Sequence, residues 1–159
     1  MSESACNDMI VSVDAIKASP LGEELSDAQC ETLAGVMTAC AIRDQAFLIE
    51  EGQKDDTLHI LTNGNMEVVS HTGGGDYVGL QVLRAGDMLG ELGFLDGVEH
   101  SAGLRAMGNC ELIRLDRASF EGLLDKDPDL VYKVMRSIVR TVHRILRNMN
   151  FQQVELTNY

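Results

Sequence analysis

The spacing of hydrophobic and polar residues divides the chain into three zones. Between Asp14 and about Cys40, apolar residues recur at the three- and four-residue spacing of amphipathic helices, and Ser26 precedes DAQCETLAGVM as an N-cap. The Ser19-Pro20 step is expected to divide this zone into two short helices, because proline lacks an amide donor and restricts the residue before it.

The middle zone, from Ala41 to about Leu115, consists of short runs rich in β-forming residues and separated by turn residues. Around Asn63-Gly64, the run TLHILTNGNMEVVS alternates apolar and polar positions, which predicts a hairpin with its turn at that dipeptide. The three glycines at 73–75 mark a second hairpin tip. Strands at this spacing favour a sandwich or a closed barrel over a parallel sheet.

From Asp116 onward the helical period returns, first in RASFEGLLDKD and then in a long helix that begins at Pro128 and ends near Gln152. Two apolar stripes lie on this helix. The first has coiled-coil spacing and contains Val131, Met135, Ile138, Val142, Ile145 and Met149. The second contains Leu130, Val134, Val139 and Leu146.

An apolar surface of this width is expected to pack both on its own domain and on the same helix of a second copy, which predicts a homodimer. The alternative is a helix that packs wholly on its own barrel.

Length and composition suit one domain, with 45% hydrophobic residues in 159. No apolar run approaches the length that crosses a bilayer and the first residues do not resemble a signal peptide, so we expect a cytoplasmic protein with no membrane contact. The cysteines lack metal-ligand spacing, so we expect four unpaired thiols and neither a zinc site nor a disulfide framework. They are Cys6, Cys30, Cys40 and Cys110.

The net charge of −12 argues against general nucleic-acid binding, because attraction to phosphates supplies most non-specific affinity. Residues 1–127 hold 8 Lys and Arg against 23 Asp and Glu, whereas residues 128–152 hold five Lys and Arg against Asp129 alone. An acidic body therefore carries a basic C-terminal helix, whose basic face we expect to be solvated. No direct DNA binding is expected.

The segment AGDMLGELGFLDGVEHSAGLRA, Ala85 to Ala106, interrupts the β pattern with glycine turns and about one turn of helix. Gly90 and Gly93 permit close approach of the backbone, while Glu91 and Ser101 add an acceptor and a hydroxyl. These groups suit a small anionic ligand. Taken alone, glycine turns between strands are more often structural.

This segment resembles the phosphate-binding cassette of the cyclic nucleotide-binding domain family. The resemblance extends over about residues 20–150. It includes the segments LSDAQCETLA, EEGQKDDTLHILTNGNMEVV and CELIRLDRASFEGLLDKDPDL. The resemblance implies a mainly β domain with flanking helices, an antiparallel jelly-roll-like β-barrel with N-terminal helices and a long C-terminal helix. The expected organisation is an N-terminal tail (1–13), a barrel with N-terminal helices (14–127), a dimerisation helix (128–152) and a tail (153–159).

By the same resemblance, Glu91 would accept a hydrogen bond from a ribose 2′-hydroxyl, and the backbone at Gly90 and Leu92 would line the sugar. Ser101, by its hydroxyl and amide, and Ala102, by its amide, would hold the cyclic phosphate.

His100 departs from the pattern, because ligand-binding relatives place an arginine there, and Glu99 stands where proline is common. An arginine bonds phosphate through a permanently charged fork, whereas a histidine of ordinary pKa is mostly neutral at pH 7 and offers one donor at a time. Protonation of His100, favoured by Glu91 or Glu99, would restore a cation. Arg105 is a further candidate for the missing charge, although an arginine on a strand is more often solvated.

Two functions follow. The first is a stand-alone sensor that binds a cyclic nucleotide (cAMP or cGMP) or a similar small anion and signals through its C-terminal helix to an unidentified protein partner. The alternative is a degenerate family member that acts as a dimerising or protein-interaction module. DNA-binding relatives carry a further domain after the long helix, where only FQQVELTNY follows here.

An enzyme is the least expected class, because no catalytic or metal constellation has a supporting motif. No cofactor is expected, and His59, His71 and His143 are interpreted as isolated surface or core residues.

Overall fold

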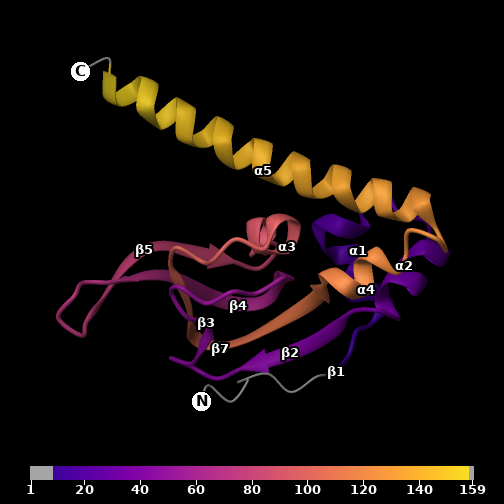
Figure 1. Ribbon diagram of the computed structural model, residues 1–159, viewed down its shortest axis with the longest axis horizontal. Coiled ribbons are helices and arrows are strands. Elements are labelled where there is room, and N and C mark those ends of the chain that lie inside the picture. Colours follow the sequence, from indigo (N-terminus) through magenta and orange to yellow (C-terminus); the bar gives the residue numbers. More distant parts are fainter. Residues whose placement is uncertain (1–8, 158–159) are drawn as a thin grey trace.

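The computed structural model describes the backbone of residues 9–157 and the side chains of residues 9–148. Three short helical segments follow the first short strand, β1 (Met9–Ile10), namely α1 (Val13–Ala18), η1 (Pro20–Gly22) and α2 (Asp27–Ala34). Helix α3 (Glu91–Asp96) lies between later strands, and α4 (Arg117–Glu121) and α5 (Pro128–Thr157) follow the last strand. Figure 1 shows the N-terminal helices and α4 together at one end of the strands, with α5 passing over them.

The N-terminal helices confirm the predicted division at Pro20. Ser26 caps α2, because its hydroxyl accepts from the amide of Gln29 at 3.2 Å and the side chain of Gln29 accepts from the amide of Ser26 at 3.1 Å. The helix ends at Ala34, so the expectation of a helical zone up to Cys40 is wrong. The amide of Gly35 closes the last turn, and strand β2 (Thr38–Ile42) already contains Cys40.

Within the described backbone, seven antiparallel strands form one sheet. The remaining strands are β3 (Phe47–Ile49), β4 (Thr57–His71), β5 (Tyr77–Arg84), β6 (Met88–Leu89) and β7 (Gly103–Asp116). The order is β1-β2-β7-β4-β5, while β3 also pairs with β7 and β6 with β4. The predicted fold class, a mainly β, jelly-roll-like antiparallel architecture with flanking helices and a long C-terminal helix, is confirmed, although the sheet is not closed.

The predicted hairpin at Asn63-Gly64 is wrong, because β4 continues through it as one strand of 15 residues. The strand stays paired with β7 on both sides of the dipeptide, with register shifts there. Gly64 has φ 91°, and a Cβ on it would lie 2.6 Å from the carbonyl oxygen of Asn109. The glycine thus permits an irregular close approach of two long strands. The second predicted tip, at residues 73–75, does connect β4 with β5.

The sheet separates two hydrophobic clusters. Leu58 and Ile60 of β4 belong to the first, which also contains buried residues of α1, α2, α4 and α5. Leu61 and Met66 of β4 belong to the second, which lies among the strands. Because side chains alternate along a strand, His59 shares its face with Leu61 and points away from α1, α2, α4 and α5.

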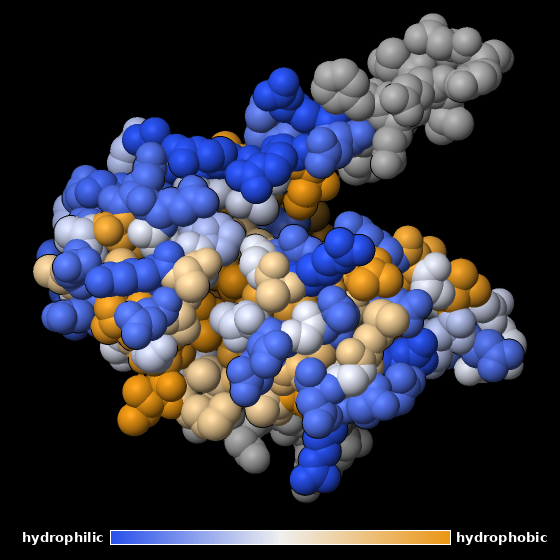
Figure 2. Space-filling view, turned by 180° about the vertical axis from the view of Figure 1, so that it is seen from behind, coloured by the Kyte–Doolittle hydropathy of each residue, from blue (hydrophilic) through white to orange (hydrophobic). Residues whose placement is uncertain are grey.

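Helix α5 begins at Pro128, as predicted, and is anchored by its first turns. Between Pro128 and Asn148, its buried residues are Leu130, Val131, Val134, Ser137 and Ile138. The hydroxyl of Ser137 donates to the carbonyl of Pro20 at 2.7 Å, and Arg140 pairs with Glu24 at 3.0 Å. The basic face is therefore not merely solvated. Residues 143–148 are exposed. Figure 1 shows α5 extending beyond the N-terminal helices, and Figure 2 shows the surface hollowed between α5 and the rest of the molecule.

The expectation of four unpaired thiols is wrong for Cys40, which is disulfide-bonded. Cys30 and Cys110 are free and buried, and Cys6 lies outside the described residues. Scattered cysteines in a sequence carry no information about their distances in space, which is why the bond was not predicted. Within residues 9–157, no helix combines the length and the apolar character needed to cross a membrane.

Candidate functional site

The glycines of the GELG segment determine how α3 is placed. Gly90, before the helix, and Gly97, after it, adopt left-handed conformations with φ 76° and 67°, which favour glycine. A Cβ on Gly93 would lie only 2.3 Å from the carbonyl oxygen of Asp55. Glycine at this position therefore lets α3 lie directly against the backbone of the segment before β4. The predicted single turn of helix is confirmed.

The six predicted site residues lie at two neighbouring places. Gly90, Glu91 and Leu92 form the start of α3, while His100, Ser101 and Ala102 end the segment that connects α3 to β7. Glu91 and Ala102 are half-buried, whereas Leu92 and Ser101 are exposed.

His100 connects these two places. Its Cε1 atom is 3.5 Å from the position that a Cβ on Gly90 would take, and its Nε2 atom is 3.4 Å from the same position on Gly93. The backbone is fixed as well, because its amide donates to Gln53 at 3.0 Å and its carbonyl accepts from Gly52 at 2.8 Å. Nε2 is buried without a hydrogen-bond partner among the described residues. The imidazole thus packs over the glycines of α3.

A second imidazole, which the sequence interpretation set aside as isolated, lies at the same place. His59 has a side chain that is 2% exposed, and its Nε2 lies 2.9 Å from Oδ2 of Asp55. Its Cδ2 atom is 3.5 Å from the position of a Cβ on Gly90. The amide of Thr57 donates to the other carboxylate oxygen of Asp55 at 3.1 Å. Asp55 therefore holds the buried histidine and the start of β4 together.

The environment keeps His59 neutral. Burial lowers the pKa of His59, and the nearby charges of Arg114 and His100 act in the same direction, against the opposing effect of Asp55. Burial acts to raise the pKa of Asp55, but the hydrogen bonds from His59 and Thr57 outweigh it, so this pKa is lowered. The consistent arrangement is an ionised Asp55 that accepts the Nε2 proton of a neutral His59.

Two signals in the sequence point to the pair of Asp55 and His59. His59 is a polar residue inside TLHIL, a run that is otherwise apolar enough for a fully buried strand. The acidic residue Asp55 precedes it by four positions.

Arg105, the other candidate cation, is engaged elsewhere. Its neighbours on β7, Leu104 and Ala106, both belong to the cluster among the strands, so Arg105 points to the opposite face. There its Nη2 lies 3.2 Å from Oε2 of Glu67, and its guanidinium is 5.8 Å from the centre of the Tyr77 ring. It does not supply the charge that is missing at His100.

The other two histidines take no part in this site. His71 is exposed and its ring lies 4.3 Å from that of Tyr77, and His143 is exposed on α5. Within the described part of the chain, no group of three or more His, Cys, Asp and Glu residues is arranged to hold a metal ion.

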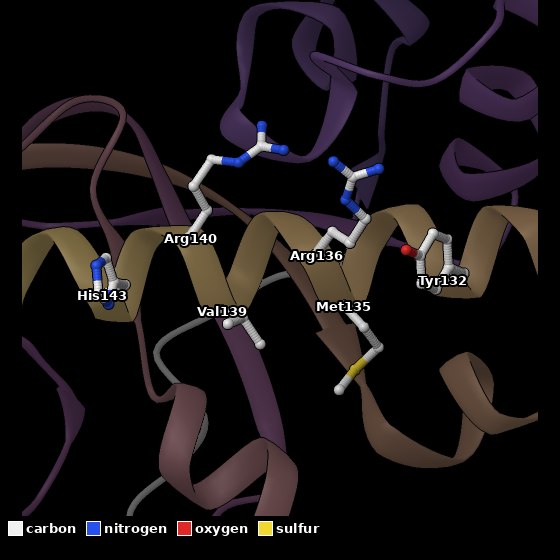
Figure 3. Close-up of a pocket in the computed structure, with 6 residues that line it drawn as sticks. All are labelled: Tyr132, Met135, Arg136, Val139, Arg140 and His143. Carbon is white, nitrogen blue, oxygen red and sulfur yellow. The ribbon is translucent and has the colours of Figure 1, made fainter.

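A groove of about 460 Å³ runs along α5. It is lined by Tyr132, Met135, Arg136, Val139, Arg140 and His143. In Figure 3, the arginines point towards the N-terminal helices, while Met135 and Val139 point to the opposite side. Tyr132, Val139 and Leu146 are each more than half exposed and lie seven residues apart. Val131 and Ile138 of the first predicted stripe are buried in the domain itself, whereas Val139 and Leu146 of the second are exposed.

Comparison with known proteins identifies this architecture. The sequence model of the cyclic nucleotide-binding domain matches residues 40–127, more than half of the chain. The chain is 31% identical to the cAMP-activated global transcriptional regulator CRP of Salmonella typhimurium over 113 residues, which cover 69% of this chain and 54% of the regulator. It thus spans about half the length of the curated relatives it matches.

Solved structures show the same fold. A cyclic nucleotide-binding domain from Methylobacillus flagellatus has a TM-score of 0.84 at 18% identity, covering 95% of this chain and 89% of that chain. A second structure is a mutant regulatory subunit of a cAMP-independent protein kinase A from Trypanosoma brucei, bound to cAMP in its A site. It has a TM-score of 0.69 at 22% identity, and the match covers 91% of this chain and 50% of that chain. The match to the domain model over more than half of the chain shows that this protein belongs to the cyclic nucleotide-binding domain family.

Proposed function

We propose that this chain is a regulatory sensor domain that binds a cyclic nucleotide, or a similar small anion, between α3 and the start of β7. The observation that carries the proposal is the packing of His100 against Gly90 and Gly93, because it joins the two halves of the family's cassette in one place. In this proposal Glu91 accepts from the ribose 2′-hydroxyl, and the backbone at Gly90 and Leu92 lines the sugar. Ser101 and Ala102 hold the phosphate.

His100 is the weak point of such a site. Loss of the charge-assisted pair between an arginine and phosphate in a partly buried site costs about 2 to 5 kcal/mol, which is roughly 30-fold to several thousand-fold in affinity. The Trypanosoma brucei subunit that was solved with cAMP carries three substitutions, one of which replaces a threonine by arginine. That precedent supports testing an introduced arginine in this chain.

The test is titration calorimetry of the wild-type chain and of His100→Arg with cAMP and with cGMP. We expect the variant to bind at least about 30-fold more tightly than the wild type. Arg105→Met serves as the control, because Arg105 lies on the opposite face and its loss should leave the affinity unchanged. If neither protein binds either nucleotide at millimolar concentration, the alternative applies and the chain is a degenerate member that acts through protein contacts.

For transmission, we propose that two copies pair through the exposed seam of α5. Tyr132, Val139 and Leu146 are exposed at 60%, 59% and 52% and recur with the heptad spacing of a helix–helix contact. A ligand alters such a contact only if it binds two arrangements of α5 with different affinity.

Light scattering after size exclusion tests the pairing. We expect a dimer for the wild type and a monomer for Leu146→Glu, because a buried carboxylate without a partner opposes association. Arg147→Glu places the same charge on the next residue and should remain dimeric. A monomeric wild type at about 10 micromolar would contradict the pairing and leave ligand binding untouched.

A further inference from the structure

Two imidazole rings flank Gly90. His59 and His100 come from β4 and from the segment before β7, and each has a ring carbon 3.5 Å from the position that a Cβ on Gly90 would take. The structure therefore places two histidine side chains beside the proposed ligand site.

The two rings differ in how they are held. His59 is almost completely buried, and its Nε2 proton is used in the 2.9 Å hydrogen bond to Asp55. A second proton on Nδ1 would make a cation in a buried position where no partner among the described residues accepts it. His59 is thus fixed as a neutral ring.

His100 has no such bond. It is half-buried on a connecting segment, and only its backbone is fixed, by Gly52 and Gln53. Its Nε2 has no partner within the described residues. The charged or titratable groups on the elements around it are Asp55 and His59, Arg114 on β7, Glu91 on α3, and the preceding Glu99.

We propose that the site takes up its anionic ligand together with one proton, which resides on His100. This inference rests on the proposed function. The proton is transferred from a hydronium ion or buffer acid, whose bond to it breaks as the new N–H bond forms on the unprotonated ring nitrogen, so no further reactant is needed. An anion beside an imidazole favours the protonated ring, which then supplies the charge-assisted hydrogen bond that a neutral ring lacks. His59 does not take this proton, because its environment opposes charge.

The experiment measures proton uptake when cAMP binds, because its phosphodiester keeps one charge near neutral pH. Calorimetry at pH 7 in two buffers of different ionisation enthalpy gives the number of protons taken up for each cAMP bound. Repeating the titration from pH 8 to pH 6 gives the dependence of Kd on pH. His100→Arg is the matched variant with a permanent charge. His143→Gln removes an exposed histidine far along α5 and is the control for titration outside the site.

We expect the wild type and His143→Gln to take up a substantial fraction of one proton, and their Kd to fall by up to about tenfold per pH unit on acidification. His100→Arg should bind with no uptake and a flat profile. Wild-type binding with a flat profile, or uptake that persists in His100→Arg, overturns the proton inference while the proposed function stands. Binding of cAMP by His100→Arg alone also overturns it, since the native chain then takes up neither cAMP nor a proton. Absence of binding in both proteins overturns both proposals.

Discussion

Oδ2 of Asp55 accepts a hydrogen bond at 2.9 Å from Nε2 of His59, four residues later, and the carbonyl oxygen of the same aspartate lies against Gly93. One residue thus connects a buried imidazole in the sheet with the helix of the ligand cassette. The integrity of the proposed site depends on this connection, and it can be tested without any ligand.

Removal of the carboxylate is expected to destabilise the domain. Asp55→Ala leaves the buried Nε2 donor of His59 without its acceptor, which costs about 1 to 3 kcal/mol. Urea unfolding measures the loss. Asp56→Ala, one residue further on at an exposed position, is the control and should change stability by less than about 0.5 kcal/mol. Equal losses for both variants would show that the hydrogen bond to His59 contributes nothing.

Acidification should reduce stability through His59. Its pKa is lower in the folded chain than in the unfolded chain, so between these two values the unfolded state binds more protons. Stability therefore falls as the pH drops below about 6.5, the ordinary histidine value, with a slope of at most about 1.4 kcal/mol per pH unit. Urea unfolding at pH 7.5, 6.5 and 5.5 should show a smaller decrease for His59→Gln than for the wild type. His143→Gln should behave as the wild type, and an unchanged decrease in His59→Gln would contradict the assignment.

A single methyl group at Gly93 should displace α3. In Gly93→Ala the new carbon would meet the carbonyl of Asp55 at 2.3 Å, so the helix must move, at a cost of about 1 to 3 kcal/mol. Leu92→Ala, at the neighbouring exposed position, should have a small effect. Thermal unfolding of both variants is the measurement, and equal melting temperatures would mean that α3 is not constrained at this contact.

The attachment of α5 to the N-terminal helices should depend on one hydroxyl. Ser137→Ala removes the 2.7 Å hydrogen bond to the carbonyl of Pro20 and should cost about 1 kcal/mol. Thr141→Ala removes a bond within α5 itself, to the carbonyl of Ser137, and should be nearly neutral because alanine favours helices. Hydrogen exchange of α5 amides should increase in the first variant only. Unchanged exchange in Ser137→Ala would show that other contacts hold the helix.

The fold class could be predicted from the sequence, and so could those helix starts that depend on local chemistry. Ser26 and Pro128 begin helices because capping and the missing proline donor act within one turn. Gly64 shows what a local sequence pattern cannot predict. An Asn-Gly pair is a strong hairpin signal, but here its partner is the carbonyl of Asn109, far along the chain, and local pattern holds no information about that approach.

The candidate site shows the same difference between features that are local in the sequence and contacts between residues far apart in it. The glycines and His100 were found because they stand in a continuous segment, whereas His59 was missed because its partners at the site, Gly90 and His100, follow much later in the sequence. Which of the two apolar stripes of α5 stays exposed could not be predicted, for a related reason. Val131 and Ile138 fit a coiled-coil pattern, but only the packing of α5 on the domain decides which apolar residues remain exposed.

Helix α5 is fastened along its first turns and then extends past the last anchored residues to Thr157. The seventeen residues beyond Arg140, at about 1.5 Å each, make a lever of about 25 Å, so a tilt of about ten degrees at its base moves the tip by about 4 Å. Displacements too small to disturb the N-terminal helices are therefore magnified at the far end.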